Sequence, residues 1–187
     1  MRIDCFNIIK DPCFCFFCKI PEIITTKISY ASYKRKIFSI LGEVKNKKIL
    51  VYYPLKNEVN LKKTILKLRK NNQVYLPFME HESFKAVKYR LPLQQKKFGT
   101  FEAGNSLKHT NIIDIAIVPV IGIDKNLQRV GFGKGMYDRF FSKLQKKPYT
   151  IFVQADLCFT KEIVCDHYDI GCDVVVTPKL IIKNENI

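Results

Sequence analysis

From residue 28 onward, short apolar runs alternate with longer segments in which apolar residues recur at helical spacing. Apolar runs rich in β-branched and aromatic residues are typical of buried strands. They predict strands at residues 48–54, 73–79, 84–91, 112–119, 149–155 and 172–177. The helical spacing predicts helices at residues 29–41, 58–70 and 134–144.

Strands that alternate with helices at these lengths predict an α/β fold with a mostly parallel central sheet. We expect one domain, residues 28–187, with helices on both faces of the sheet in a Rossmann-like three-layer arrangement. Residues 112–119 form the most apolar run, so this strand is expected at the centre of the sheet, and residues 84–91 at an edge.

The first 27 residues do not follow this pattern. Pro12 and Pro21 enclose a stretch rich in phenylalanine that supports neither a regular helix nor a strand. We expect residues 1–27 to be an atypical N-terminal extension or arm. Cys13, Cys15 and Cys18 resemble half of a zinc site, but no second pair of ligands follows at the usual spacing.

The charge of the chain is unusual. Its 187 residues carry a formal net charge of +15 while 47% of them are hydrophobic. Clustered basic residues would indicate a nucleic-acid surface, because they replace the counterions of phosphates. Here the lysines are spread along the chain and no nucleic-acid-binding motif accompanies them. A lysine-rich solvated surface is the favoured interpretation, and an anionic small substrate is compatible with it.

The cysteines indicate a reducing environment. Their number, seven, is odd, and they crowd near the two ends of the chain, which does not suit a disulfide framework. Charged residues and prolines interrupt the N-terminus, unlike a signal peptide, and no run approaches the roughly twenty apolar residues of a membrane span. We expect a cytoplasmic protein, a monomer without a membrane or nucleic-acid partner.

The segment from Arg129 to Arg139 carries the clearest chemistry. It places glycines at 131, 133 and 135, with a lysine at 134 and an aspartate at 138. Glycine buries no side chain, so three of them in alternate positions indicate a tight turn or a close approach to another group. A strand, a glycine-rich loop and a helix in this order direct backbone N–H groups at an anion.

Charged side chains complete that pattern. Lys134 supplies a point charge for a phosphate, and Arg129 or Arg139 a bidentate clamp. Asp138 suits Mg²⁺, which binds few carboxylates together with phosphate oxygens. The segment is neither a Walker loop nor a dinucleotide-binding fingerprint. On these residues alone, a glycine-rich turn that only begins a helix is an equal alternative.

Four segments follow one another along the chain: Tyr53-Pro54-x-x-x-Glu58-Val59, Phe98-Gly99-Thr-Phe-Glu102, Arg129-x-Gly-x-Gly-Lys-Gly-x-Tyr-Asp138, and Asp166-His167-Tyr-Asp169 followed by Asp173-Val-Val-Val-Thr177. In this order they resemble the 5-formyltetrahydrofolate cyclo-ligases, also called methenyltetrahydrofolate synthetases. The resemblance extends over about residues 30–180, with Ala103 and Met136 in place of a proline and a tyrosine usual in the family.

The resemblance implies an ATP- and Mg²⁺-dependent conversion of 5-formyltetrahydrofolate to 5,10-methenyltetrahydrofolate, with release of ADP and phosphate. Phosphoryl transfer would activate the formyl oxygen, and Lys134 and Arg129 would be catalytic. Tyr53 and Glu58 would bind the folate, and Asp138 and Asp169 the metal. The ATP-binding residues by the same match are Arg129, Gly131, Phe132, Gly133, Lys134, Gly135, Met136 and Tyr137.

Several of these positions have simpler readings. Asp169 suits a turn, Tyr53 a core, and Glu58 the first turn of a helix; Glu102 is left outside the site. Family members typically begin with a Lys-x-x-Leu-Arg-like helix, and residues 1–27 do not reproduce it. A nucleotide-binding relative without turnover and a basic nucleic-acid-binding module are therefore the alternatives.

Overall fold

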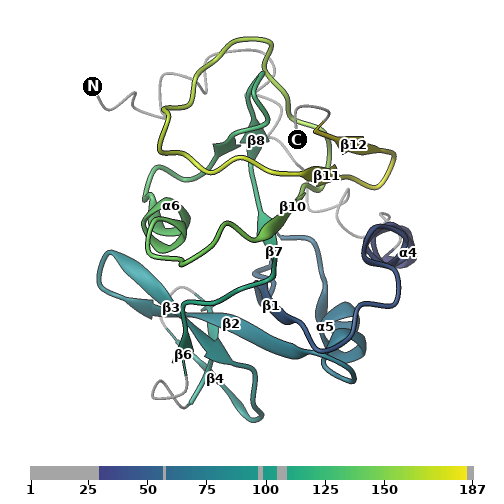
Figure 1. Cartoon of the computed structure of the whole chain (residues 1–187), viewed down its shortest axis with the longest axis vertical. Coiled ribbons are helices and arrows are strands. Elements are labelled where there is room, and N and C mark those ends of the chain that lie inside the picture. Colours follow the sequence, from purple (N-terminus) through teal and green to yellow (C-terminus); the bar gives the residue numbers. More distant parts are fainter. Residues whose placement is uncertain (1–29, 57, 97–98, 105–108, 185–187) are drawn as a thin grey trace.

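The computed structural model describes residues 30–184 except 57, 97–98 and 105–108 (Figure 1). The expected N-terminal arm and the Cys13/Cys15/Cys18 cluster lie outside these residues. An eight-stranded sheet runs through the molecule in the order β12-β11-β10-β7-β1-β2-β3-β6. Its strands are β1 (Lys48–Val51), β2 (Gln73–Glu80), β3 (Ser83–Lys88), β6 (His109–Thr110), β7 (Ile115–Pro119), β10 (Tyr149–Val153), β11 (Val174–Val176) and β12 (Ile181–Lys183).

The centre of the sheet is parallel. Strands β11, β10, β7, β1 and β2 pair in parallel, and antiparallel strands extend the sheet at both sides. The mostly parallel α/β sheet is therefore confirmed, with β7 near its centre as the apolar run predicts. The strand expected at residues 84–91 is not at an edge, because β6 pairs along the outer side of β3.

Helices cover both faces of the sheet, also as expected. The helices α4 (Tyr30–Leu41) and α5 (Lys62–Leu68) lie on one face, and α6 (Met136–Phe141) lies on the other (Figure 1). The pleat assigns alternate residues of each strand to the two faces. In β1, Ile49 and Val51 pack with α4 and α5, whereas Leu50 belongs to the cluster under α6.

Two helices are shorter than their apolar spacing predicts. The segment before α5 forms a turn in which the Tyr52 hydroxyl donates to the Val59 carbonyl at 2.8 Å. Helix α5 consequently begins at Lys62 rather than at Glu58, so Glu58 is not a helix first-turn residue. Helix α6 begins at Met136, because Gly135 before it has a left-handed backbone, with φ of 56°.

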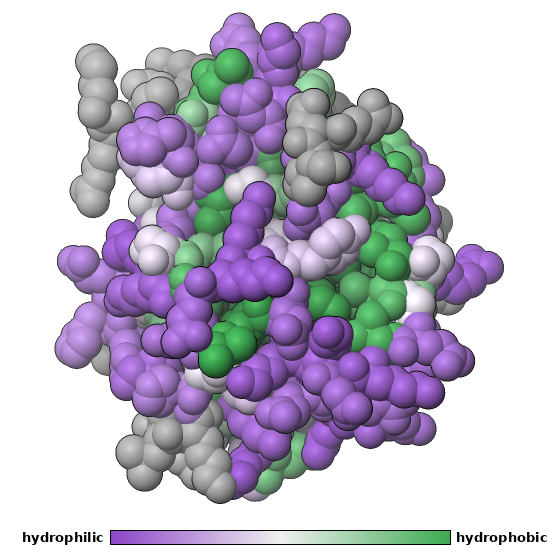
Figure 2. Space-filling view, in the orientation of Figure 1, coloured by the Kyte–Doolittle hydropathy of each residue, from purple (hydrophilic) through white to green (hydrophobic). Residues whose placement is uncertain are grey.

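Short hairpins that the apolar pattern does not predict lie beside the sheet. Strand β4 (Leu93–Gln95) pairs with β5 (Phe101–Ala103), and β8 (Gly122–Ile123) pairs with β9 (Arg129–Val130). The second hairpin leads directly into the glycine-rich loop. Among the described residues, no helix has the length and apolar character to cross a membrane. The face of the molecule in Figure 2 is mostly hydrophilic, with hydrophobic side chains visible near its middle.

Candidate active site

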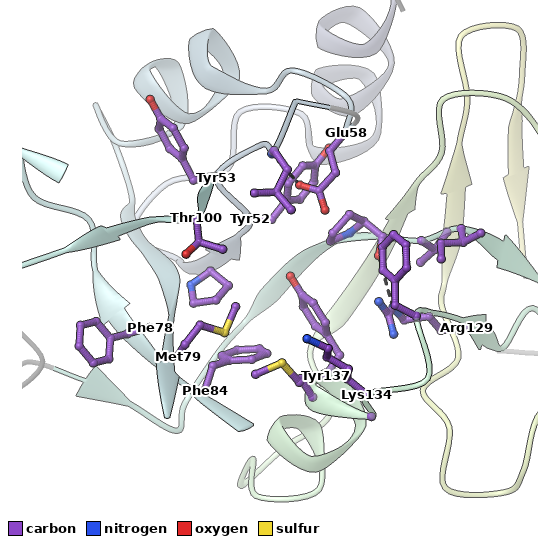
Figure 3. A pocket seen from close by; sticks show the side chains of 18 of the residues that line it. Tyr52, Tyr53, Glu58, Phe78, Met79, Phe84, Thr100, Arg129, Lys134 and Tyr137 are labelled. Carbon is purple, nitrogen blue, oxygen red and sulfur yellow. Dashed lines mark hydrogen bonds between the residues drawn. The ribbon is translucent and has the colours of Figure 1, made fainter. Parts of the chain in front are cut away.

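A cavity of about 1080 Å³ opens at the carboxyl ends of the parallel strands (Figure 3). Residues that follow β1, β7 and β10 line it together with the glycine-rich loop. From β1 the chain crosses to β2 on one side, whereas from β7 it crosses to β10 on the other. Ligands of open α/β sheets bind at such a reversal of strand order.

The glycine-rich loop forms one wall of the cavity. Gly133 and Gly135 both have positive φ angles, 76° and 56°, which other residues rarely adopt. Gly131 serves a different purpose: a Cβ atom there would stand 2.1 Å from Nη1 of Arg129. The loop residues of the predicted ATP site that border the cavity are Arg129, Phe132, Gly133, Lys134, Gly135, Met136 and Tyr137.

Arg139 joins this loop to the turn between β2 and β3, which also borders the cavity. Its Nε donates to the Glu82 carbonyl at 2.7 Å, in the turn between β2 and β3. Its Nη2 donates to the carbonyl oxygens of Glu82 and Lys134. The arginine therefore holds the backbone of the loop at Lys134, and the Lys134 side chain is drawn beside Tyr137 in Figure 3.

A charged cluster stands at the centre of the cavity. The Arg129 guanidinium lies 4.9 Å from the ring centroid of Tyr137, and its Nε donates to the Pro119 carbonyl at 3.3 Å. Burial and the Glu58 carboxylate raise the pKa of Tyr137 well above its ordinary value, against the opposing effect of Arg129. The hydroxyl of Tyr137 is therefore neutral at physiological pH and remains a hydrogen-bond donor.

Glu58 faces this cluster from the segment after β1, as Figure 3 shows. Its Oε2 accepts a hydrogen bond from the Leu55 N–H at 2.9 Å. Burial raises the pKa of the Glu58 carboxyl, while the Leu55 N–H and Arg129 lower it. The structure thus brings Glu58 of the predicted folate site and Arg129 of the predicted phosphate site into one electrostatic unit.

Tyr53 lines the same cavity but points away from that unit (Figure 3). Its ring packs against Phe101 at 5.2 Å between centroids, and the Lys62 ammonium lies 5.1 Å from the Tyr53 centroid. Tyr53 is half-buried rather than part of the closed core, and its ring borders the ligand space. A planar ligand can pack against such a surface.

The two predicted metal ligands, Asp138 and Asp169, are neighbours and do not line the cavity. Asp138 Oδ1 accepts a hydrogen bond from the Ile170 N–H at 3.2 Å, and Asp169 Oδ2 accepts one from the Asp166 N–H at 2.8 Å. Burial raises the pKa of Asp169, and the neighbouring carboxylates of Asp138 and Asp166 raise it further. Among the described residues, no three potential ligands form a closed metal site.

Cysteine chemistry is absent from the described part of the site. Cys165 and Cys172 are free thiols. Burial, followed by nearby carboxylates, raises the pKa of Cys165 far above its ordinary value, and burial raises that of Cys172 to about 12. Neither supplies the thiolate that a nucleophilic cysteine requires.

Sequence reasoning missed two buried carboxylates. Asp124 is fully buried in the β8–β9 turn, where it accepts the N–H groups of Asn126 and Gln128 at 2.9 Å and of Cys165 at 3.3 Å. An aspartate followed by polar residues is the local signal of such a turn. Glu102 is 4% exposed and lines the cavity. Its only signal is its place in the Phe98–Glu102 segment.

Comparison with known proteins identifies related sequences. Residues 27–178 match the 5-formyltetrahydrofolate cyclo-ligase family. A 5-formyltetrahydrofolate cyclo-ligase of Mycoplasma genitalium is 28% identical over 130 residues, which cover 70% of this chain and 72% of the relative. One of Haemophilus influenzae is 28% identical over 142 residues, covering 71% and 76%.

Solved structures share the fold. The 5,10-methenyltetrahydrofolate synthetase of Aquifex aeolicus superposes with a TM-score of 0.66 at 24% identity, covering 88% of this chain and 92% of the other. The 5,10-methenyltetrahydrofolate synthetase of Mycoplasma pneumoniae gives 0.63 at 20% identity, covering 90% and 96%.

Proposed function

The chain belongs to the 5-formyltetrahydrofolate cyclo-ligase family, and we propose from this premise how its cavity performs the reaction. The protein is a ligase of folate metabolism that converts 5-formyltetrahydrofolate to 5,10-methenyltetrahydrofolate. In the proposed reaction, ATP supplies the energy of ring closure and leaves as ADP and phosphate. A monomer in the cytoplasm is the proposed form, and the free thiols of Cys165 and Cys172 support a reducing compartment.

The observation that carries this proposal is the electrostatic interaction between the glycine-rich loop and the segment after β1. Arg129 begins the glycine-rich loop, and its charge acts on both Glu58 and Tyr137. A site that joins a phosphate-binding loop to a hydrogen-bond acceptor for a second ligand suits a transfer between two bound substrates. Holding both substrates in reacting geometry accounts for a large part of such catalysis.

The chemistry requires a better leaving group on the formyl carbon. Transfer of the terminal phosphoryl group of ATP to the formyl oxygen forms a P–O bond and releases ADP. N10 of the folate then attacks the formyl carbon, the C–O bond breaks, phosphate leaves and N10 loses its proton. Positive groups that face the phosphate oxygens stabilise the transferred charge. In this proposal Lys134 and Arg129 are those groups.

The residues present fit a magnesium ion beside the loop. Asp138 and Asp169 are neighbouring carboxylates whose mutual repulsion contributes to the raised pKa of Asp169. A cation relieves that repulsion, and Mg²⁺ needs only one or two protein carboxylates besides water and phosphate oxygens. When bound, the ion would neutralise phosphate charge; the two aspartates would orient it.

A substitution at Lys134 tests the proposal. Wild-type protein incubated with 5-formyltetrahydrofolate and MgATP should produce the near-ultraviolet absorbance of methenyltetrahydrofolate. Lys134→Ala should lower kcat by about 10² to 10³-fold, as expected for the loss of one charge-stabilising group. Because Lys134 is exposed, the thermal unfolding midpoint of the Lys134→Ala variant should equal that of the wild type.

Lys125→Ala, at an exposed lysine of the β8–β9 turn, is the matched control and should retain full activity. Nucleotide binding by folded wild-type protein without product would instead indicate a relative that lacks turnover. Near-normal kcat in Lys134→Ala would remove the lysine from its assigned role.

A further inference from the structure

Glu102 is a buried carboxylate in the cavity wall, and the reaction proposed above gives it no role. It lies in the middle of β5, opposite Gln94 of β4, and its side chain is almost completely withdrawn from solvent. It nevertheless borders the same cavity as Glu58 and Arg129. Among the described residues, the cavity therefore has two half-buried or buried carboxylates, Glu58 and Glu102, and the second is the more deeply buried.

The surroundings of Glu102 satisfy little of its hydrogen-bonding capacity. Its Oε1 accepts a hydrogen bond from the Met79 N–H at 3.3 Å, which is long for a charged acceptor. In the described part of the chain, the ion pairs of acidic residues do not include Glu102. An ionised carboxylate has about four acceptor positions. Burial of a carboxylate with so few partners is unfavourable unless a ligand completes its hydrogen bonds.

Asp124 shows how this protein satisfies a carboxylate whose role is structural. Three backbone N–H groups surround it, and it has no access to the cavity wall. Glu58 is likewise supported, by the Leu55 N–H and by the charge of Arg129. Among the described residues, Glu102 accepts one long hydrogen bond, from the Met79 N–H at 3.3 Å, and takes part in none of the ion pairs. It nevertheless lines the cavity, where a ligand can supply further donors.

The position of Glu102 indicates which part of a ligand it meets. Met79, which donates to it, and the adjacent Phe78 lie on the opposite side of the cavity from Arg129 in Figure 3. Phe101, the residue before Glu102, packs on Tyr53 at the same wall. Glu102 thus belongs to the end of the cavity far from Arg129, beside aromatic rings that suit a flat heterocycle.

We propose that Glu102 is a specificity-determining residue that accepts hydrogen bonds from the 2-amino and N3–H groups of the pterin ring. The inference rests on the proposed function, because it takes 5-formyltetrahydrofolate as the ligand. The two N–H groups form a parallel pair that matches the two oxygens of a carboxylate. They lie on the ring edge remote from the reacting N5 and N10, as Glu102 lies remote from Arg129.

Glu102→Gln tests the hydrogen bonds to the pterin while it keeps the hydrogen bond to the Met79 N–H. The amide oxygen of glutamine still accepts the Met79 N–H, whereas its NH₂ group presents donors to the donors of the pterin. We expect the KM for 5-formyltetrahydrofolate to rise at least about tenfold, as for the loss of a hydrogen bond to a charged group. The KM for ATP, kcat and the thermal unfolding midpoint should stay near the wild-type values.

Glu80→Gln is the matched control, since Glu80 ends β2 one residue after Met79 and pairs with Lys85 at 2.6 Å instead of bordering the cavity. It should leave both KM values unchanged. Equilibrium binding of 5-formyltetrahydrofolate without ATP provides a readout that does not depend on turnover. A substrate analogue without the 2-amino group should bind the wild type weakly and Glu102→Gln no more weakly.

The outcomes are distinct. An unchanged KM for 5-formyltetrahydrofolate in folded Glu102→Gln would overturn the proposal while the wild-type reaction stands. A selective rise in the KM for ATP would overturn it in favour of adenine recognition. A wild type that neither binds nor converts 5-formyltetrahydrofolate would overturn the proposed function first, and this inference with it.

Discussion

At the scale of single residues, the glycines of the loop serve two different physical needs. Gly133 has a left-handed φ of 76°, so a side chain there strains the backbone. Gly131 has no such angle, and a side chain there would instead displace the Arg129 guanidinium, whose Cζ lies 2.7 Å from the Cβ position. One glycine therefore permits the shape of the loop, and the other permits the position of a charge.

Substitution of Gly133 should lower stability, whereas substitution of Gly131 should lower activity. Gly133→Ala should lower the free energy of unfolding by about 1–2 kcal/mol, the cost of a left-handed backbone for a residue with a Cβ. Gly131→Ala should change stability by less than about 1 kcal/mol, because a flexible side chain end can move aside, but should lower kcat/KM at least about tenfold. Denaturant unfolding and steady-state kinetics measure both. Wild-type kcat/KM in Gly131→Ala would show that the position of Arg129 is unimportant.

Glu58 should show a conflict between stability and function. Burial raises its pKa in the folded protein above the ordinary 4.5. The charged form therefore costs stability at pH values above the folded pKa, and the cost fades as the pH falls through that pKa towards 4.5. Glu58→Gln should raise the free energy of unfolding at neutral pH and lose this gain near pH 4.5.

The same variant should bind 5-formyltetrahydrofolate more weakly, since a charged acceptor is lost. Urea unfolding at the two pH values measures the first effect, and substrate binding measures the second. A variant that is equally stable to the wild type at both pH values would contradict the burial argument.

At the scale of elements, the site depends on contacts between short segments. The β8–β9 turn is closed around the Asp124 carboxylate, and this turn positions Arg129 at the start of the glycine-rich loop. Helix α6 is joined to the segment before β11 by the hydrogen bond from Ile170 to Asp138. The two proposed metal ligands thus come from elements that only this packing brings together.

Removal of one ligand should weaken magnesium binding without loosening that contact. In Asp138→Asn the amide oxygen still accepts the Ile170 N–H, so the unfolding midpoint without magnesium should be unchanged. The Mg²⁺ concentration for half-maximal activity should rise at least about tenfold, the smaller loss seen even for outer partners of metal ligands.

Asp156→Asn is the control. Asp156 is an exposed carboxylate whose ion pair, with Lys179 at 3.9 Å, does not involve the two proposed metal ligands. It should not alter the magnesium dependence. An unchanged magnesium dependence in Asp138→Asn would argue against a metal ligand at this position.

At the scale of the whole molecule, the described core begins with α4. Tyr33 and Ile37 of this helix are almost fully buried against the parallel strands. We propose that residues 28–187 are the folding unit and that residues 1–27 are an extension to it. The apolar clusters on the two faces of the sheet consist of residues from α4 onward, which supports residues 28–187 as the folding unit.

Truncation tests this division. A chain of residues 28–187 should unfold within about 1 kcal/mol of the full chain, roughly 2–4 °C in midpoint for a domain of this size. A chain that starts at residue 44 lacks α4, and each large side chain removed from a core costs about 2–5 kcal/mol. The loss of stability in this shorter chain should approach the whole free energy of unfolding. A large loss in the first truncation would place residues 1–27 within the folding unit.

Local signals in the sequence were enough for the architecture and for one wall of the site. Hydrophobic periodicity predicts the parallel strands, because the side chains of each buried strand report their own environment. The glycines around Lys134 indicate an anion-binding loop for the same reason, since backbone angle and charge are properties of neighbouring residues. The segment resemblance adds the family, which the match over residues 27–178 confirms.

Only the tertiary structure decided which distant groups share the cavity. Periodicity places α5 too early, because the turn that holds Glu58 depends on the Tyr52 hydroxyl and the Leu55 N–H rather than on apolar spacing. The approach of Glu58 to Arg129 and the burial of Glu102 are long-range contacts with no local signature. The sequence alone therefore determines the sheet and the glycine-rich loop, whereas the carboxylates that face the ligand are selected by packing, since burial and charge neighbours exist only in the folded chain.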